Sequence, residues 1–166
     1  MTDTTTRLTK AYNQMLETTK EIIDLSKREG APAVLFALDE AKEKVAETME
    51  LTGEEIEKIS DYVVRDLHDA AEYIAVGERE LGDWLRIDAL YIESSLLDMF
   101  SHMVDETALA LNEIKLKADE IGVWNTGEIT GIGTLACKDC GEILQFKTTG
   151  PIPHCPKCNH TEFKRS

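Results

Sequence analysis

The sequence predicts a mainly α protein, with an elongated helical bundle or coiled-coil-like N-terminal region and a small C-terminal β zinc ribbon. Apolar residues recur every three to four positions up to about residue 121. Glycine and proline are then frequent, and the helical period is lost. Two Cys-x-x-Cys pairs lie in this last part. We therefore expect an acidic helical domain at residues 1–125 and a zinc ribbon at residues 126–166.

Three helices are expected before residue 77. Gly30 and Pro32 separate the first from the second, and Thr52 with Glu55 forms a capping box that begins the third. The buried side of the first helix contains Leu8, Tyr12, Met15, Thr19, Ile22 and Ser26. That of the second contains Val34, Leu38, Ala41, Val45 and Met49. That of the third contains Ile56, Ile59, Val63, Leu67, Ala70 and Ile74.

The fourth expected helix runs from about Asp83 to Ile121 and carries two apolar stripes. One stripe contains Leu85, Ala89, Ile92, Leu96, Met99, Met103, Ala110, Ile114 and Ile121. The other advances in steps of seven and contains Leu90, Leu97, Val104 and Leu111. The stripes lie roughly 100° apart, so such a helix needs more than one neighbour. The second stripe predicts a homodimer through this helix, because exposed leucine at heptad spacing favours association.

Negative charge is concentrated in the helical part. The chain carries a net charge of −14. Residues 1–125 hold 13 Lys/Arg against 28 Asp/Glu, a net of −15, and residues 126–166 hold 5 against 4, a net of +1. An acidic body repels phosphate backbones, which makes nucleic acid an unfavoured partner. The chain has no apolar run long enough to cross a membrane and no basic, apolar signal peptide, so we expect a cytoplasmic protein without membrane association.

The four cysteines have metal-ligand spacing. Cys137, Cys140, Cys155 and Cys158 form the pattern C-x2-C-x14-C-x2-C. Two residues between paired cysteines allow a tight turn to present both sulfurs, and two such knuckles complete the tetrahedron that structural zinc prefers. A reducing compartment also favours a metal over disulfides. We therefore predict one structural zinc ion with these four ligands. The closed shell leaves no position for a substrate, which argues against a catalytic zinc.

Two other uses of the cysteines are a rubredoxin-like iron site and thioredoxin-type redox chemistry at Cys137 and Cys140. The second needs a strand followed by a helix, which the flanking glycines and expected strands oppose. His154 and His160 flank the second pair as substitute ligands, although four sulfurs suffice. Strands are expected at 133–136, 142–148 and 161–164. The small core is expected to contain Leu135, Ile143, Phe146, Ile152 and Phe163.

The chain resembles a bacterial family of zinc-ribbon-containing proteins of unknown function. The ribbon carries the resemblance in Thr126-Gly127-Glu128, Gly131-Ile132-Gly133, Leu135, Cys137-Lys138-Asp139-Cys140, Cys155-Pro156-Lys157-Cys158 and Phe163. It continues more weakly upstream in Glu50-Leu51-Thr52, Arg65-Asp66-Leu67 and Asp105-Glu106-Thr107. Asn159 departs from the glycine preferred after the second cysteine of a knuckle, but asparagine tolerates a positive φ. The resemblance implies a fold and a metal, and no reaction.

Two comparisons test for a more specific function. A rubrerythrin-like redox enzyme needs Glu-x-x-His pairs pointing into a helical bundle. His68 and His102 lack them, because Arg65 and Met99 stand three positions before these histidines. We also expect His68 to lie opposite the apolar stripe, and we expect the carboxylates to be solvated. Stringent-response transcription factors carry Asp-x-x-Asp-x-Ala at the tip of a coiled-coil hairpin. Asp66, Asp69 and Ala71 reproduce that spacing, but in the middle of an expected helix.

The sequence therefore favours a non-catalytic zinc-binding protein that acts as a protein-interaction or adaptor module. The alternative is a nucleic-acid- or RNA-polymerase-associated regulator that acts through the ribbon. For that role, Phe146 or Phe163 would stack on bases. The available cations are Lys138, Lys147, Lys157, Lys164 and Arg165. A local net charge of +1 is weak for nucleic acid, whereas strand edges, knuckle loops and acidic helices suit a protein partner, whose identity stays open.

Overall fold

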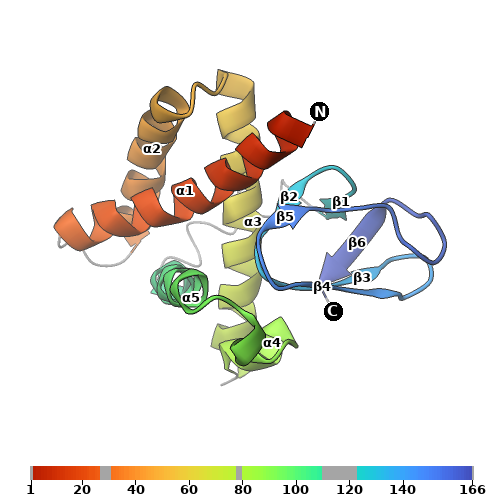
Figure 1. The fold of residues 1–166 in the computed structure, drawn as a ribbon. Helices are drawn as coiled ribbons and strands as arrows, with labels where there is room; N and C mark the ends of the chain where they lie inside the picture. Colours follow the sequence, from red (N-terminus) through yellow and green to blue (C-terminus); the bar gives the residue numbers. More distant parts are fainter. Residues whose placement is uncertain (1, 27–30, 78–79, 110–122, 166) are drawn as a thin grey trace.

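The computed structural model describes residues 2–26, 31–77, 80–109 and 123–165 of the 166-residue chain. It is mainly α with a small C-terminal β region, as the sequence predicts (Figure 1). The helices are α1 (Thr2–Ser26), α2 (Ala31–Thr48), α3 (Gly53–Gly77), α4 (Leu81–Leu85), the 3-10 helix η1 (Ala89–Tyr91) and α5 (Ser94–Leu109). The strands are β1 (Trp124–Asn125), β2 (Ile129–Thr130), β3 (Gly133–Cys137), β4 (Ile143–Phe146), β5 (Gly150–Pro151) and β6 (Glu162–Arg165).

Helix α3 is the centre of the helical part. It packs against α1, α2 and α5, and it lies between α2 and α5 on one side and the β region on the other (Figure 1). The expected stripes of the first three helices are buried or partly buried against the common core wherever the structure describes their side chains. The cap of α3 is also confirmed, since the Glu55 backbone N–H donates to the Thr52 hydroxyl at 3.1 Å. Because α1 crosses α3, the described helices pack as a bundle and do not form one elongated coiled coil (Figure 1).

The expected fourth helix is not continuous. It is interrupted between α4 and α5, where Arg86 adopts a left-handed conformation with φ 55° and Asp88 caps η1 by accepting the Leu90 N–H at 3.0 Å. Local side-chain and backbone bonds thus replace the helical bonds that periodicity predicted. The second stripe is split accordingly, because Leu90 is 90% exposed whereas Val104 is 1% exposed. Leu97 is partly buried in the core, and Leu111 lies outside the described residues.

The β region forms two antiparallel sheets. The larger has the order β1-β6-β3-β4, and the smaller pairs β2 with β5. The three expected strands correspond to β3, β4 and β6. Leu135, Ile152 and Phe163 are buried in one apolar cluster of the β region as predicted, and Phe146 packs against it. Ile143 is the exception, because its side chain is 45% exposed on the edge strand β4.

The β region is packed against the helices through buried side chains. Ile129 and Ile132, which lie within the expected ribbon, belong to the same apolar cluster as the helix residues. Thr134 on β3 donates its hydroxyl proton to the Leu85 carbonyl of α4 at 2.6 Å. The expected boundary between residues 125 and 126 stays a prediction, and buried contacts cross it.

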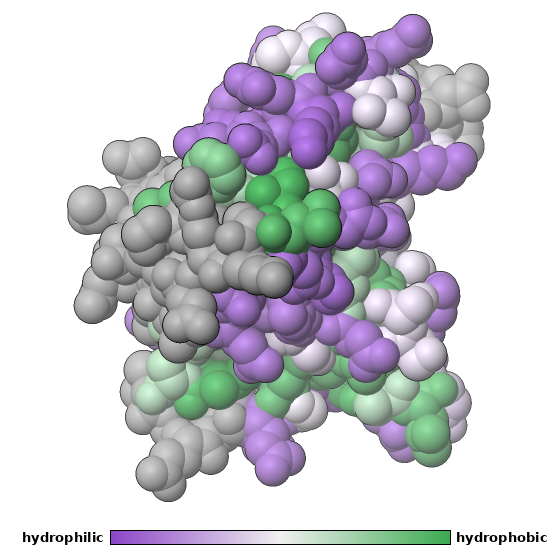
Figure 2. Space-filling model, turned by 90° about the vertical axis from the view of Figure 1, so that its left-hand side faces the viewer, coloured by the Kyte–Doolittle hydropathy of each residue, from purple (hydrophilic) through white to green (hydrophobic). Residues whose placement is uncertain are grey.

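One face of the molecule can be compared by its hydropathy. In the face that Figure 2 shows, hydrophilic side chains predominate and the hydrophobic areas between them are small. Among the described residues, no helix is both long and apolar enough to cross a membrane.

Candidate metal centre and the buried polar cluster beneath it

Two similar turns present the four cysteines. In the first, the Gly141 N–H donates to the Cys137 carbonyl at 3.0 Å, and in the second the Asn159 N–H donates to the Cys155 carbonyl at 2.9 Å. The residue after each pair has a positive φ, 80° at Gly141 and 65° at Asn159. Asparagine therefore takes the left-handed position usually given to glycine, as its tolerance of that region predicts.

The four thiols fit a tetrahedral metal site. Their sulfur atoms all lie within 4.8 Å of one another, and the shortest separations are 3.5 Å, from Cys137 to Cys158 and from Cys140 to Cys155. A tetrahedron of sulfurs about 2.3 Å from zinc has edges of roughly 3.8 Å, so the spacing suits this ion with only small shifts. Each short pair joins one knuckle to the other, as expected for ligands that share one ion.

The pKa values of Cys155 and Cys158 indicate that all four cysteines become thiolates only when a cation lies between them. Burial raises the pKa of Cys155, but the N–H groups of Cys158 and Lys157 outweigh it and lower the pKa to about 6. The Cys158 thiol accepts a backbone hydrogen bond that favours its thiolate, yet burial and the other three cysteines raise its pKa to about 12. Four sulfurs so close together cannot all ionise without a positive ion between them.

The candidate histidine ligands are not part of this cluster. Among the described residues, the group that could hold a metal contains the four cysteines alone. His154 is exposed and His160 is half-buried. The His160 carbonyl instead accepts the Cys155 N–H at 2.9 Å, so this residue supports the second knuckle through its backbone.

Asp66, on α3, is a buried charge that sequence reasoning did not identify. Its side chain is fully buried, against the expectation that the carboxylates are solvated. Its two carboxylate oxygens accept hydrogen bonds from Tyr12, Arg65, Trp124, Thr130 and the Gly131 N–H, and they form an ion pair with Arg165. The distances lie between 2.5 and 3.2 Å. Four of these donors come from residues 124–165, so the carboxylate joins the β region to the helices.

Two arginines flank this carboxylate. Arg65 also contacts Glu128 at 2.8 Å and donates to the Ile129 carbonyl at 3.1 Å. Arg165, near the end of β6, has a 7% exposed side chain whose guanidinium lies 4.5 Å from the Trp84 ring centre and 5.0 Å from that of Trp124. The groups that surround the two buried guanidinium groups therefore come from both the helices and the β region.

The Asp66 cluster is structural. Burial alone would raise the pKa of Asp66, but Arg65 and Arg165 outweigh it and hold the pKa below its usual range. The same burial, together with the Asp66 charge, raises the pKa of Tyr12 well above its usual value. A carboxylate that is ionised, fully buried and enclosed by donors has no free oxygen to accept a proton from a substrate.

The Asp-x-x-Asp-x-Ala spacing is accounted for by packing. Asp66 is buried in the cluster, and Asp69 accepts the Trp84 indole N–H at 2.8 Å. Burial raises the pKa of Asp69. These residues lie in the middle of α3, which is not the tip of a hairpin. His68 is also buried, 7% exposed, although the sequence places it opposite the apolar stripe, so α3 is covered on more than one side.

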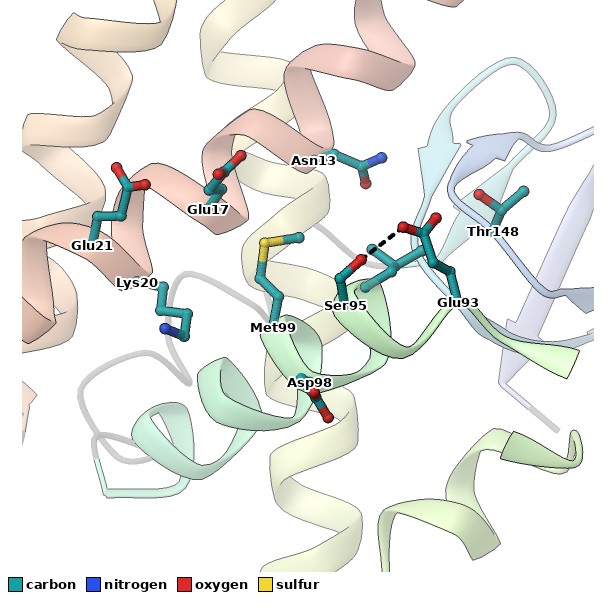
Figure 3. Close-up of a pocket in the computed structure, with 10 residues that line it drawn as sticks. Asn13, Glu17, Lys20, Glu21, Glu93, Ser95, Asp98, Met99 and Thr148 are labelled. Carbon is teal, nitrogen blue, oxygen red and sulfur yellow. Dashed lines mark hydrogen bonds between the residues drawn. The ribbon is translucent and has the colours of Figure 1, made fainter. Parts of the chain in front are cut away.

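A surface pocket of about 470 Å³ lies between α1 and α5, and the four cysteines are not among its lining residues (Figure 3). Met99 lies between the residues from α1 and those near the start of α5 (Figure 3). Four of its lining side chains are the exposed carboxylates Glu17, Glu21, Glu93 and Asp98. Because these carboxylates are solvated, the pocket offers no desolvated acid or base for catalysis.

The fold and the closed four-thiol site define a helical protein with a structural zinc ribbon. A family model described as a zinc-ribbon containing domain matches residues 20–166. The chain belongs to this zinc-ribbon family and holds one structural zinc ion. The description of the family names no reaction.

Relatives in Escherichia coli extend the similarity over most of the chain. The proteins named "Uncharacterized protein YbeL" in strain K12, strain O6:H1 and strain O157:H7 are each 31% identical over 140 residues. The match covers 83% of this chain and 85% of each relative. No solved structure matches the chain.

Proposed function

We propose that this protein is a non-catalytic adaptor that binds another protein through a surface beside the ribbon. The thiol cluster and the Asp66 cluster are both closed to substrates, so the chemistry they support is structural. What carries the proposal is the exposure of large apolar side chains where the expected fourth helix is interrupted. Leu90 is 90% exposed and Tyr91 is 68% exposed, although both lie on an ordered turn. Exposed leucine and tyrosine side chains of this kind are typical of protein-binding surfaces.

The features of the ribbon give less support to nucleic-acid binding. Phe163 is fully buried and Phe146 packs on the ribbon core, so stacking on bases would require the ribbon to open. Lys138 pairs with Glu162 at 3.3 Å, and the Lys147 ammonium lies 5.0 Å from the Tyr91 ring centre. The acidic helices add repulsion at longer range.

The adaptor proposal predicts that a change at Leu90 removes a partner without unfolding the protein. The tagged full-length chain would be purified from its own cells, and its co-purifying proteins compared with those of Leu90→Glu. Recovery of the partner is expected to fall about tenfold or more, because a charge replaces an apolar contact. Stability is expected to change by less than about 0.5 kcal/mol, because Leu90 is solvent-exposed.

Leu25→Glu is the matched control, because Leu25 is 83% exposed on a different helix, α1. It should recover the partner as the unmodified chain does. The adaptor proposal is wrong if no protein co-purifies in stoichiometric amount, or if both variants retain the same partners.

A second expected result separates the two binding classes. Single-stranded DNA and RNA should bind the zinc-loaded protein no more tightly than about 1 μM near physiological salt, the level of non-specific association. Fluorescence anisotropy over a range of salt concentrations measures this affinity. Sub-micromolar, salt-sensitive binding that is lost when Lys138, Lys147 and Lys164 are replaced by alanine would favour the nucleic-acid alternative.

A further inference from the structure

Among the strands that the structure describes, β4 is an open edge of the larger sheet. It pairs with β3 on one side and is last in the order β1-β6-β3-β4. Every residue of β3 is buried, whereas the residues of β4 alternate between exposed and half-buried. With four residues β4 is also longer than β1, the two-residue strand at the opposite edge.

The hydrogen-bond register shows which backbone groups of β4 face this open edge. The Cys137 N–H donates to the Glu142 carbonyl at 2.8 Å, and the same ladder pairs Leu135 with Leu144. In an antiparallel ladder, hydrogen-bonded pairs alternate with pairs whose N–H and C=O groups point away from the partner strand. Leu144 therefore bonds to β3, while Ile143 and Gln145 direct their N–H and C=O groups outward.

Side chains beside this edge add an apolar surface. Ile143 is 45% exposed on β4. Gln145 donates to the Arg86 carbonyl at 3.3 Å, and the Lys147 ammonium contacts the Tyr91 ring at 5.0 Å, so the turn from Arg86 to Tyr91 lies alongside β4. The exposed side chains of η1 thus adjoin the strand whose outward N–H and C=O groups have no partner among the described residues.

We propose that an extended segment of a protein partner adds to β4 as a fifth strand of the sheet. The proposal rests on the adaptor function and names its binding surface. The outward N–H and C=O groups of Ile143 and Gln145 can pair with the backbone of another extended chain. A helical partner cannot pair with them in this way, because its own N–H and C=O groups are bonded within the helix. Apolar side chains at every second position of the segment would contact Ile143 and the Leu90–Tyr91 turn.

The test uses a random twelve-residue peptide library displayed on phage and selected on the full-length, zinc-loaded protein. Selected peptides are expected to alternate apolar and polar residues. Their affinity should fall at least tenfold for Gln145→Pro, which removes one outward N–H and leaves the bonds to β3 in place. Gln145→Thr is the matched control, because it loses the same bond to Arg86 but keeps the N–H. Circular dichroism and zinc content verify that both variants are folded.

Amide hydrogen exchange of the unmodified protein gives a second, mutation-free test. In the free protein, the Leu144 and Phe146 amides should be protected and those of Ile143 and Gln145 should exchange fast. Adding a selected peptide should protect Ile143 and Gln145. The proposal is overturned if no peptide binds at micromolar affinity, or if binding neither protects these amides nor responds to Gln145→Pro. It is also overturned if a second copy already protects them, in a dimer that Gln145→Pro dissociates.

Failure of strand addition can be distinguished from failure of the adaptor proposal. A co-purifying partner that is lost with Leu90→Glu but retained with Gln145→Pro would leave the adaptor in place and exclude strand addition. Both proposals would be rejected if no partner co-purifies and no peptide protects the Ile143 and Gln145 amides from exchange.

Discussion

Removal of zinc with a chelator is expected to unfold the ribbon and to lower the thermal stability of the helices as well. Two separate domains at residues 1–125 and 126–166, as the sequence predicts, would have separate cores, and the helical signal would survive zinc removal. The structure predicts otherwise, since the β region supplies Trp124, Thr130, Gly131 and Arg165 to the buried Asp66. Structural zinc contributes about 10–16 kcal/mol in small zinc peptides, which exceeds the stability of many whole domains.

Cys155→Ser should reproduce the effect of chelation, with zinc measured by elemental analysis and helicity by circular dichroism. About one zinc per chain is expected for the unmodified protein, with marked loss in the variant. His154→Asn is the control, because this exposed histidine lies outside the thiol cluster and should retain the metal. Helices whose melting temperature is unchanged after complete zinc loss would show that the Asp66 cluster does not couple the two parts.

Replacing Asp66 by asparagine is expected to destabilise the protein by about 3–5 kcal/mol. The variant leaves the buried guanidinium groups of Arg65 and Arg165 without their shared counter-ion. It also places an amide donor among groups that already donate, including the Tyr12 hydroxyl and the Gly131 N–H. Chemical denaturation of the zinc-loaded protein measures the free energy of unfolding.

Asp69→Asn is the matched control on the same helix, one turn away. It keeps an oxygen that can accept the Trp84 indole N–H, so its cost should stay within about 1 kcal/mol. Equal losses for both variants would mean that Asp66 has no special role in joining the two parts.

The pH dependence of the free energy of unfolding follows from the directions in which the pKa values of Asp66 and Asp69 are shifted. The pKa of Asp66 is lowered in the folded state, so its stabilisation is present above the usual unfolded value of about 3.9 and is lost as pH falls through the folded pKa. Asp66→Asn should lack this component of the acid transition. Asp69 acts in the opposite sense, because its raised pKa makes protonation favour the folded state as pH falls.

The cysteine spacing and the helical periodicity could be interpreted from the sequence because both depend on neighbours close along the chain. A C-x2-C knuckle is a local turn, and the buried sides of α1, α2 and α3 follow from a repeat of about 3.6 residues. Even the left-handed turn at Asn159 was predictable from the conformational preference of one residue.

The interruption after α4 was decided by tertiary structure. Periodicity continues through Arg86 and Leu90, but the chain there turns to place the Leu85 carbonyl against Thr134 and the Arg86 carbonyl against Gln145. Contacts with strands about 50 residues away outweigh the helix propensity of this short segment. Hydrophobic pattern alone carries no information on these bonds.

Asp66 shows the same limit at the level of a single charge. In sequence it is one acid among 32 acidic residues, and acids on helices are usually solvated. The carboxylate is buried only because Arg165, 99 positions away, and the Gly131 N–H converge on it. The sequence by itself determined the zinc ribbon, the helical class and the sides the helices bury. Only the tertiary structure decided where charge is buried and which strand edge stays open, because both depend on groups that folding brings together from distant positions.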